Sequence, residues 1–217
     1  MSKVAIVGGT GALGSAIAKR LANTGHDVAI GSRSAESAER AARELSDGVR
    51  FGTNARVAGE AEFVIVTVPY TAHAATLGEI KDVVGSAIVV DTTVPLVPPK
   101  VMRVQLPAAG SAAMEARQHL GSDARLVTAF HNVAAHRLAH DERVDCDVLV
   151  FSDDLAARGD VVTLIQSMGM RALAGGALVN SAAAEALTSL LIFMNKSYAA
   201  DGAGIRFTGL TTAPPIP

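Results

Sequence analysis

The sequence predicts an α/β protein with a doubly wound parallel sheet and a small helical appendix at its C-terminal end. Apolar runs of strand length alternate with helical patterns through most of the 217 residues. A glycine-rich turn stands between the first strand and the first helix, which is typical of Rossmann-type dinucleotide-binding domains. We therefore divide the chain into a nucleotide-binding domain, residues 1–175, and a helical segment, residues 176–217, that completes the substrate cleft.

Hydrophobic period and helix caps predict the elements of the first half. We expect strands over residues 3–8, 27–31 and 50–53. The helix expected over residues 12–23 carries Leu13, Ile17 and Leu21 on one face. Ser34 is a suitable N-cap for a second helix that ends near residue 45.

The second half of the chain again alternates strands and helices, with one long proline-rich loop between them. Residues 63–68 and 87–91 are continuous apolar runs, as expected for strands covered on both faces, with a crossover helix over 71–84 between them. The proline-rich stretch 95–107 cannot continue as regular structure. After it, we expect a helix over 112–120 and strands over 126–130 and 147–151. A helix that starts at Asp153 and Asp154 and a last helix over 182–199 complete the chain.

Composition narrows the class of protein. About half of the residues are apolar and the formal net charge is −2, which gives no electrostatic reason to expect nucleic acid or a membrane as partner. Cys146 is the only cysteine, so neither a disulfide framework nor a thiolate metal cluster is expected. The start of the chain lacks the pattern of a signal peptide, and the densest apolar stretch, residues 186–194, is too short to cross a bilayer. By exclusion, we expect a cytoplasmic protein.

The glycine turn matches the pattern G-x-G-x-x-G after a strand and before an amphipathic helix. In this pattern the first glycine permits the tight turn, the second lets a pyrophosphate approach, and the third allows the helix to contact the strand. The helix N-terminus adds backbone donors for the phosphates. The predicted contacts are Gly9, Thr10, Gly11, Ala12, Leu13 and Gly14.

The end of the second strand predicts NADP rather than NAD. An NAD-binding chain usually places an acid there for the ribose 2′-hydroxyl, but here Ser32 and Arg33 follow and no carboxylate occurs before Glu36. Arg33 offers a forked cation for a 2′-phosphate, and Ser32 and Thr10 offer hydroxyls. A solvated surface arginine is the alternative interpretation of Arg33.

The chain resembles the NADPH-dependent reductases of coenzyme F420, a 5-deazaflavin hydride carrier. The segments that carry the resemblance are GGTGALG at 8–14, GSR at 31–33, TVPYTAH at 67–73, DTTVPLVPP at 91–99, TAFHNVAAHRL at 128–138 and GIRF at 204–207. The resemblance implies hydride transfer between NADP(H) and coenzyme F420, with the nicotinamide near Val68 and Pro69. The deazaflavin would stack in a cleft lined by His131, Val133 and the C-terminal helix, with Val94 and Leu96 as apolar walls.

Several polar residues are candidates beside that cleft. His131 follows a strand at the carboxyl end of the sheet, so we assign it the catalytic role of donating to the ring or its developing charge. His73, in the first turn of a helix, can touch the cofactor. His136 and His140 are spaced for a metal on a helix, but no third ligand is evident and we expect none.

Other interpretations stay open. Lys100 and Arg103 on the proline-rich excursion can meet an acidic ligand tail or can be plain surface charges. The acceptor can be an imine, a small carbonyl compound or a flavin, or the chain can be an NADP sensor without catalysis. Neither Tyr70 nor Tyr198 has a lysine four residues on, which disfavours the catalytic short-chain dehydrogenases. The apolar stretch 187–194 is either core or the seam of a homodimer, and we favour the homodimer.

Overall fold

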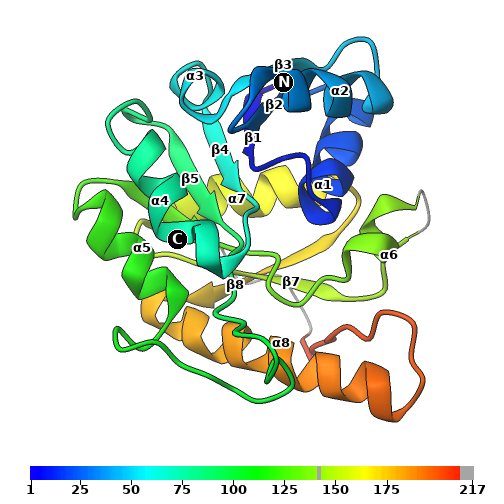
Figure 1. Cartoon of the computed structure of the whole chain (residues 1–217). Coiled ribbons are helices and arrows are strands. Elements are labelled where there is room, and N and C mark those ends of the chain that lie inside the picture. The colour runs from blue at the N-terminus through cyan, green and yellow to red at the C-terminus, as the bar shows by residue number, and fades with distance from the viewer. Residues whose placement is uncertain (141–142, 211–217) are drawn as a thin grey trace.

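A computed structural model describes residues 1–140 and 143–210 of the chain. Its eight strands form one sheet in the order β3-β2-β1-β4-β5-β6-β7-β8 (Figure 1). All neighbouring strands are parallel except β6 and β7, which pair antiparallel through Thr128 and Phe151. The strands are β1 (Lys3–Val7), β2 (Asp27–Ser32), β3 (Arg50–Thr53), β4 (Phe63–Val66), β5 (Ile88–Asp91), β6 (Arg125–Thr128), β7 (Asp147–Phe151) and β8 (Arg171–Gly176). The predicted α/β doubly wound class is confirmed.

Helices cover both faces of the sheet (Figure 1). They are α1 (Ala12–Asn23), α2 (Ala35–Leu45), α3 (Asn54–Gly59), α4 (Tyr70–Ile80), α5 (Ala112–Leu120), α6 (Ala135–Ala139), α7 (Leu155–Ser167), the 3₁₀ turn η1 (Leu178–Asn180) and α8 (Ser181–Ser197). Buried residues of α1, α2, α6 and α7 share one core cluster, and those of α3, α4 and α5 share another.

The alternation of side chains along the strands explains why the apolar runs are continuous. In β4, Ile65 belongs to the cluster under α1 and α7, whereas Val64 and Val66 belong to the cluster under α4 and α5. In β5, Val90 and Val89 divide in the same way. Both faces of these strands are therefore buried, as in other parallel sheets with helices on each side.

The structure differs from the expected elements in a few places. The strands β4 and β6 end at Val66 and Thr128, two residues earlier than the apolar runs that predict them. These apolar residues lie instead in the loops at the carboxyl edge, where ligands bind in such sheets. The sequence did not predict β8, because RALAGG lacks the β-branched residues typical of strands. The short helices α3 and α6 were also not expected, since six and five residues show no clear period.

The C-terminal part packs along the end of the sheet. One segment in the described part of the chain, Leu178–Ser197, is long and apolar enough to cross a membrane by length and composition alone, with a mean hydropathy of 1.3. The carboxylate of Glu185 in its middle is buried against α5, which is the packing of a helix in a folded domain. After α8 the chain returns to the sheet, where the Asp147 amide donates to the Ile205 carbonyl at 2.8 Å and the Phe207 amide donates to the Asp147 carboxylate at 2.6 Å.

Candidate functional site

The turn between β1 and α1 is closely packed at two of its glycines and open at a third. A Cβ atom on Gly14 would lie 2.6 Å from Thr67 Oγ1, and one on Gly9 would lie 2.7 Å from the backbone of β1. A Cβ atom on Gly11 would meet nothing closer than the Gly8 carbonyl oxygen at 3.8 Å. Protein packing thus requires Gly9 and Gly14 to be glycine, whereas the space above Gly11 is free for a ligand.

Helix α1 begins beside that space without a side-chain cap. Its N-cap is Gly11, which has no side chain to bond the first amides. Because the amides of a first turn have no partner within the helix, those of Ala12, Leu13 and Gly14 are donors for an anion. Thr10 is exposed in the same turn. The geometry suits the phosphates of a dinucleotide.

The loop after β4 touches the glycine turn directly. Gly8 has a φ of +71°, and a Cβ atom there would lie 2.4 Å from Cγ1 of Val68. The Thr67 hydroxyl donates to the Val7 carbonyl at 3.0 Å and holds this loop against the end of β1. Pro69 is the exposed N-cap of α4. The structure therefore brings the predicted nicotinamide contacts Val68 and Pro69 next to the predicted pyrophosphate contacts.

The end of β2 lies on the other side of the same turn. The amide of Gly9 donates to the carbonyl of Gly31 at 3.0 Å, which ties the glycine turn to β2. Ser32 is half-buried and Arg33 is exposed. Within the described residues Arg33 makes no ion pair or hydrogen bond, so its guanidinium is free to bind a phosphate. Ser34 caps α2 by accepting from the Ser37 amide.

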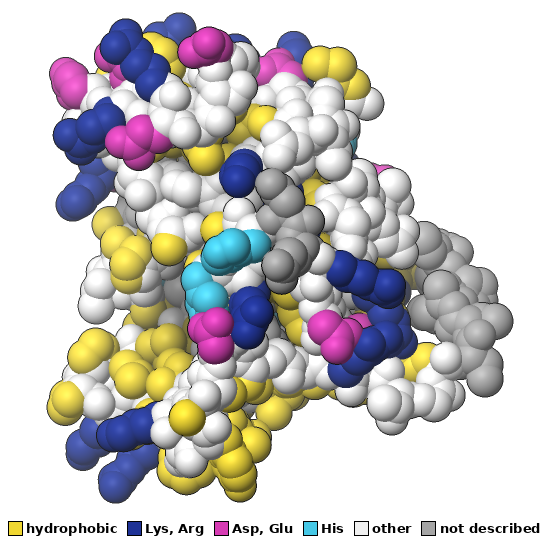
Figure 2. Space-filling view, turned by 90° about the vertical axis from the view of Figure 1, so that its right-hand side faces the viewer, with side chains coloured by type: hydrophobic (Ala, Val, Ile, Leu, Met, Phe, Trp, Pro, Cys, Tyr) yellow, Lys and Arg dark blue, Asp and Glu magenta, His cyan; other side chains and the backbone are white. Residues whose placement is uncertain are grey.

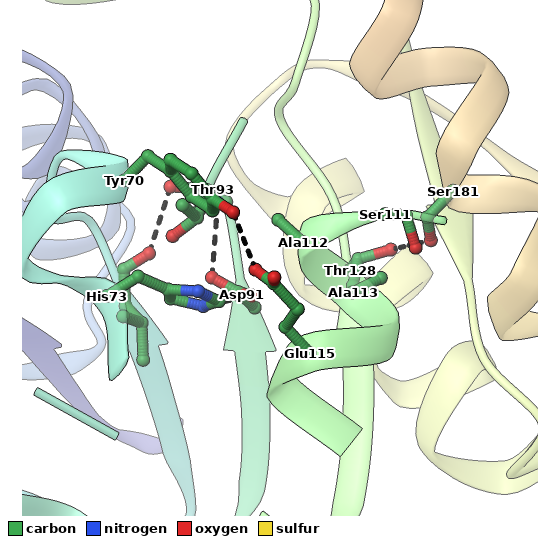
Figure 3. A network of polar contacts seen from close by, with 12 residues as sticks. Tyr70, His73, Asp91, Thr93, Ser111, Ala112, Ala113, Glu115, Thr128 and Ser181 are labelled. Atoms are coloured by element: carbon green, nitrogen blue, oxygen red, sulfur yellow. Dashed lines mark hydrogen bonds and ion pairs between the residues drawn. The ribbon is translucent and has the colours of Figure 1, made fainter. Parts of the chain in front are cut away.

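His73 is buried and does not reach the surface beside the glycine turn. It is 2% exposed, and its Nε2 lies 2.8 Å from the Asp91 carboxylate at the end of β5 (Figure 3). The other Asp91 oxygen accepts from the Thr93 amide at 3.1 Å. Burial alone would lower the pKa of His73, but the hydrogen bond and charge of Asp91 outweigh it and raise this pKa above its ordinary value. The Nε2 atom of His73 is thus held by Asp91 and does not face solvent.

The loop after β6 carries His131 and Val133. His131 is buried, and neither ring nitrogen makes a hydrogen bond within the described part of the chain. Burial lowers the pKa of His131 to about 4, so its ring is neutral at neutral pH. Val133 is half-buried and packs on the same core cluster as Leu13 of α1. In this arrangement His131 can donate from one nitrogen of a neutral ring.

Hydrogen bonds from side chains to backbone carbonyls attach the same loop to α8. The Thr188 hydroxyl donates to the His131 carbonyl at 2.8 Å, and the Asn132 amide group donates to the Ala184 carbonyl at 2.8 Å. In the loop that follows the neighbouring strand β5, Val94 and Leu96 are half-buried. The apolar residues predicted for the cleft thus follow β4, β5 and β6 at the carboxyl edge of the sheet.

Two acids on the helices around this edge were not identified from the sequence. Glu185 of α8 accepts from the amides of Ala112 and Ala113 at the start of α5, at 2.7 and 3.1 Å. Burial raises the pKa of Glu185 to about 7, although the two amides act in the opposite direction. Glu115 of α5 accepts from the Tyr70 hydroxyl at 2.9 Å (Figure 3). A lone acid within an apolar helix, as at Glu185, is the sequence signal that points to such a buried contact.

A separate cavity lies on the side of the molecule that carries α6. It has a volume of about 450 Å³ and is lined by α6 and its flanks, residues 143–146 before β7, and residues 201–204, without any of the predicted cofactor contacts. Histidine and charged side chains gather there in the middle of the face shown in Figure 2. His136 pairs with Asp201 at 2.8 Å, and His140 Nδ1 lies close to the His136 carbonyl. Among the residues that the structure describes, no group of three His, Cys, Asp or Glu is placed to hold a metal ion.

Comparison with known proteins gives the family. Residues 3–95 match the family model described as NADP oxidoreductase coenzyme F420-dependent. The F420-dependent NADP reductase of Methanothermobacter marburgensis is 38% identical over 96% of this chain and 99% of its own length. The enzyme of the same name from Methanocaldococcus jannaschii is 37% identical, with 96% of this chain and 99% of its own length covered.

Solved structures show the same fold. A crystal structure from Arthrobacter sp. FB24, provisionally named an F420-dependent NADP-reductase, superposes with a TM-score of 0.85 at 24% identity and covers 96% of this chain and 100% of its own. An imine reductase from Streptomyces aurantiacus has a TM-score of 0.63 at 17% identity, over 90% of this chain and 63% of its own. Since the match to the archaeal reductases runs through nearly the whole of both chains, the protein belongs to the family of F420-dependent NADP oxidoreductases.

Proposed function

We propose that this protein is an NADPH-dependent F420 reductase, which transfers a hydride between NADP(H) and coenzyme F420. The observation that carries the proposal is the 38% identity to a reductase of that name over 96% of the chain. The open space over Gly11 and the free guanidinium of Arg33 fit the phosphates of NADP. When bound, NADPH supplies the hydride and the deazaflavin accepts it.

The residues of the crevice have positioning roles in this proposal. The amides at the start of α1 hold the pyrophosphate, while Arg33 and the hydroxyls of Ser32 and Thr10 hold the 2′-phosphate. Val68 and Pro69 support the nicotinamide ring. Because transfer between two flat rings depends on alignment and on exclusion of water, apolar walls contribute more than a nucleophile would.

The acceptor side is formed by the loops after β5 and β6 together with α8. We assign Val94 and Val133 to the walls, and His131 to the acceptor as a neutral hydrogen-bond donor. The attachment of residues 131 and 132 to α8 supports the division into an NADP-binding domain, residues 1–175, and a C-terminal segment, residues 176–217, that completes the cleft. Residues 211–217 of that segment lie outside the described residues.

Absorbance spectroscopy tests the activity directly. Purified protein is mixed with oxidised coenzyme F420 and either NADPH or NADH, and the deazaflavin band is followed. Bleaching that requires NADPH and is much weaker with NADH supports the proposal. If the protein binds NADPH but bleaches no deazaflavin, the activity is wrong, and imines, carbonyl compounds and flavins are the next acceptors to assay, followed by a sensor role.

We further infer that the protein works as a homodimer in the cytoplasm. Leu190 and Phe193, one turn apart on α8, are 50% and 47% exposed, and Met102, Val104 and Leu106 of the proline-rich excursion are exposed as well. Hydrophobic side chains gather at the lower end of the molecule, where α8 lies (Figures 1 and 2). Exposed apolar patches of this kind mark interfaces between proteins. Cell fractionation tests the location.

A further inference from the structure

A buried charge pair stands beside the proposed nicotinamide site, and hydride transfer itself does not require it. His73 and Asp91 are 2% and 1% exposed and are joined at 2.8 Å. Among the described residues no lysine or arginine is paired with Asp91, and the Thr93 amide is its other donor. Buried ionisable pairs at the edge of a crevice are commonly functional, because burying charge for structural reasons alone is costly.

The sheet places this pair close to the proposed position of the ring. Asp91 is directly opposite Val66 in the β4–β5 register, and the chain continues from Val66 into Val68 and Pro69. Adjacent strands are separated by about 4.8 Å, so Asp91 is one strand away from these ring contacts. His73 lies in the first turn of the helix that starts after Pro69. Both members of the pair therefore adjoin the loop that supports the ring.

The nicotinamide ring is positively charged in NADP⁺ and neutral in NADPH. A carboxylate near it stabilises the oxidised form and has little effect on the reduced form. We propose that the buried Asp91 carboxylate makes the protein bind NADP⁺ in preference to NADPH, and that protonation of His73 weakens this preference. The inference rests on the proposed function, since it uses the position of the nicotinamide over Val68 and Pro69.

The other titratable groups around the pair are few. Tyr70 lies on α4, Glu115 on α5, Glu185 on α8 and His131 after β6, and all but Tyr70 are in electrostatic range of His73 or Asp91. The pKa of His73 is raised above its ordinary value, so the ring is charged at acid pH and becomes neutral as the pH rises through that higher value. The net charge of the pair changes from zero to −1. The preference for NADP⁺ should increase in the same direction.

The test measures dissociation constants rather than turnover. Isothermal titration gives the constants of NADP⁺ and NADPH at pH 5.5, 7 and 8.5 for the wild-type protein, for Asp91→Asn and for Glu115→Gln. The Glu115 variant is the matched control, because it removes one negative charge from the next helix. Unit charges about 12 Å apart change an equilibrium constant about tenfold at an effective dielectric constant of about 20, and closer charges change it more.

We expect Asp91→Asn to weaken NADP⁺ binding at least about tenfold at pH 8.5 and to change NADPH binding less than twofold. Glu115→Gln should change the ratio of the two constants less than threefold. Equal losses for both nucleotides in Asp91→Asn, or an unchanged ratio, would overturn the inference while leaving the proposed function intact. If the wild-type protein binds neither nucleotide, both proposals fail.

If Asp91→Asn does not fold, the same dissociation constants are measured for His73→Gln. Glutamine can still donate to Asp91, but it cannot be protonated. The ratio of the constants should then lose most of its change between pH 5.5 and 8.5. Glu185 ionises over the same range and contributes with the same sign, so Glu185→Gln is measured in parallel. A pH dependence that persists in His73→Gln and disappears in Glu185→Gln contradicts the role of His73.

Discussion

Replacing Gly11 with alanine separates binding of the dinucleotide from folding of the protein. Gly11 has a φ of −83°, which alanine adopts without strain, and the nearest atom to the new methyl group is 3.8 Å away. Less entropy in the unfolded chain stabilises the variant by about 0.4–1 kcal/mol. Alanine is a poorer N-cap than glycine by up to about 1 kcal/mol. These terms offset each other, so the melting temperature of the protein without ligand should change by no more than about 3 °C.

The loss should appear in binding of NADPH. The methyl group occupies the space through which a pyrophosphate reaches the first amides of α1, and hydrogen bonds from amides to oxygen need about 2.9 Å. Each charge-assisted bond that is lost costs about 1.5–3 kcal/mol. Loss of one such bond predicts a dissociation constant at least tenfold higher. Fluorescence titration with NADPH measures the constant, and thermal unfolding of the ligand-free protein measures its stability.

Gly14→Ala is the matched control in the same turn. Its methyl group would lie 2.6 Å from Thr67 Oγ1 and 2.7 Å from the Gly9 Cα atom. Overpacking of this kind costs about 1–3 kcal/mol, so the melting temperature of this variant should be below that of the wild-type protein even without ligand. The assignment of the space over Gly11 to a phosphate is refuted if Gly11→Ala binds NADPH with the wild-type dissociation constant. It is also refuted if the melting temperature of Gly11→Ala is as low as that of Gly14→Ala.

Three further changes test the specificity, the buried acid and the assembly. Arg33→Ala should weaken NADPH binding by about 1.5–3 kcal/mol and leave NADH binding nearly unchanged; equal losses in the two titrations would contradict the 2′-phosphate role. The pKa of Glu185 is raised from 4.5 to about 7, so the native state holds its proton more tightly than the unfolded state and the free energy of unfolding falls as the pH rises from 4.5 to 7. Urea unfolding of Glu185→Gln should show a smaller fall over that range, and a slope equal to wild type would show that another group is responsible. Light scattering after gel filtration should give a dimer for the wild type and a monomer for Phe193→Glu on α8; a monomeric wild type at micromolar concentration would contradict the assembly.

The central strands were predictable from sequence because both of their faces are buried. The run Val64-Ile65-Val66 alternates between two core clusters, so no polar residue interrupts it. The last strand was not predictable in that way. Arg171–Gly176 has no β-branched residue and only Ala172 is buried, so its strand character depends on pairing with β7 and not on a run of apolar side chains.

The same distinction applies to the site. The glycine turn and Arg33 are local, so the order of residues was enough to propose them. The pairs His73–Asp91 and Glu185–Ala112 join residues 18 and 73 positions apart. No period or motif encodes such contacts, and only the packing of α4 and α8 against their neighbours brings the residues together. For this reason the sequence predicts His73 as a ligand contact, whereas the structure places Asp91 as its partner.

The charges are ordered along the carboxyl edge of the sheet, and under the proposed function that order favours one direction for the dinucleotide. Arg33 and the uncapped start of α1 stand at β2 and β1, where positive potential attracts phosphates. Asp91, Glu115 and Glu185 stand at β5, α5 and α8, on the other side of β4. A reversed dinucleotide would place its 2′-phosphate against three carboxyl groups and its nicotinamide beside Arg33. Repulsion at one end and attraction at the other therefore favour the orientation in which the reacting ring lies beside the loop that carries His131.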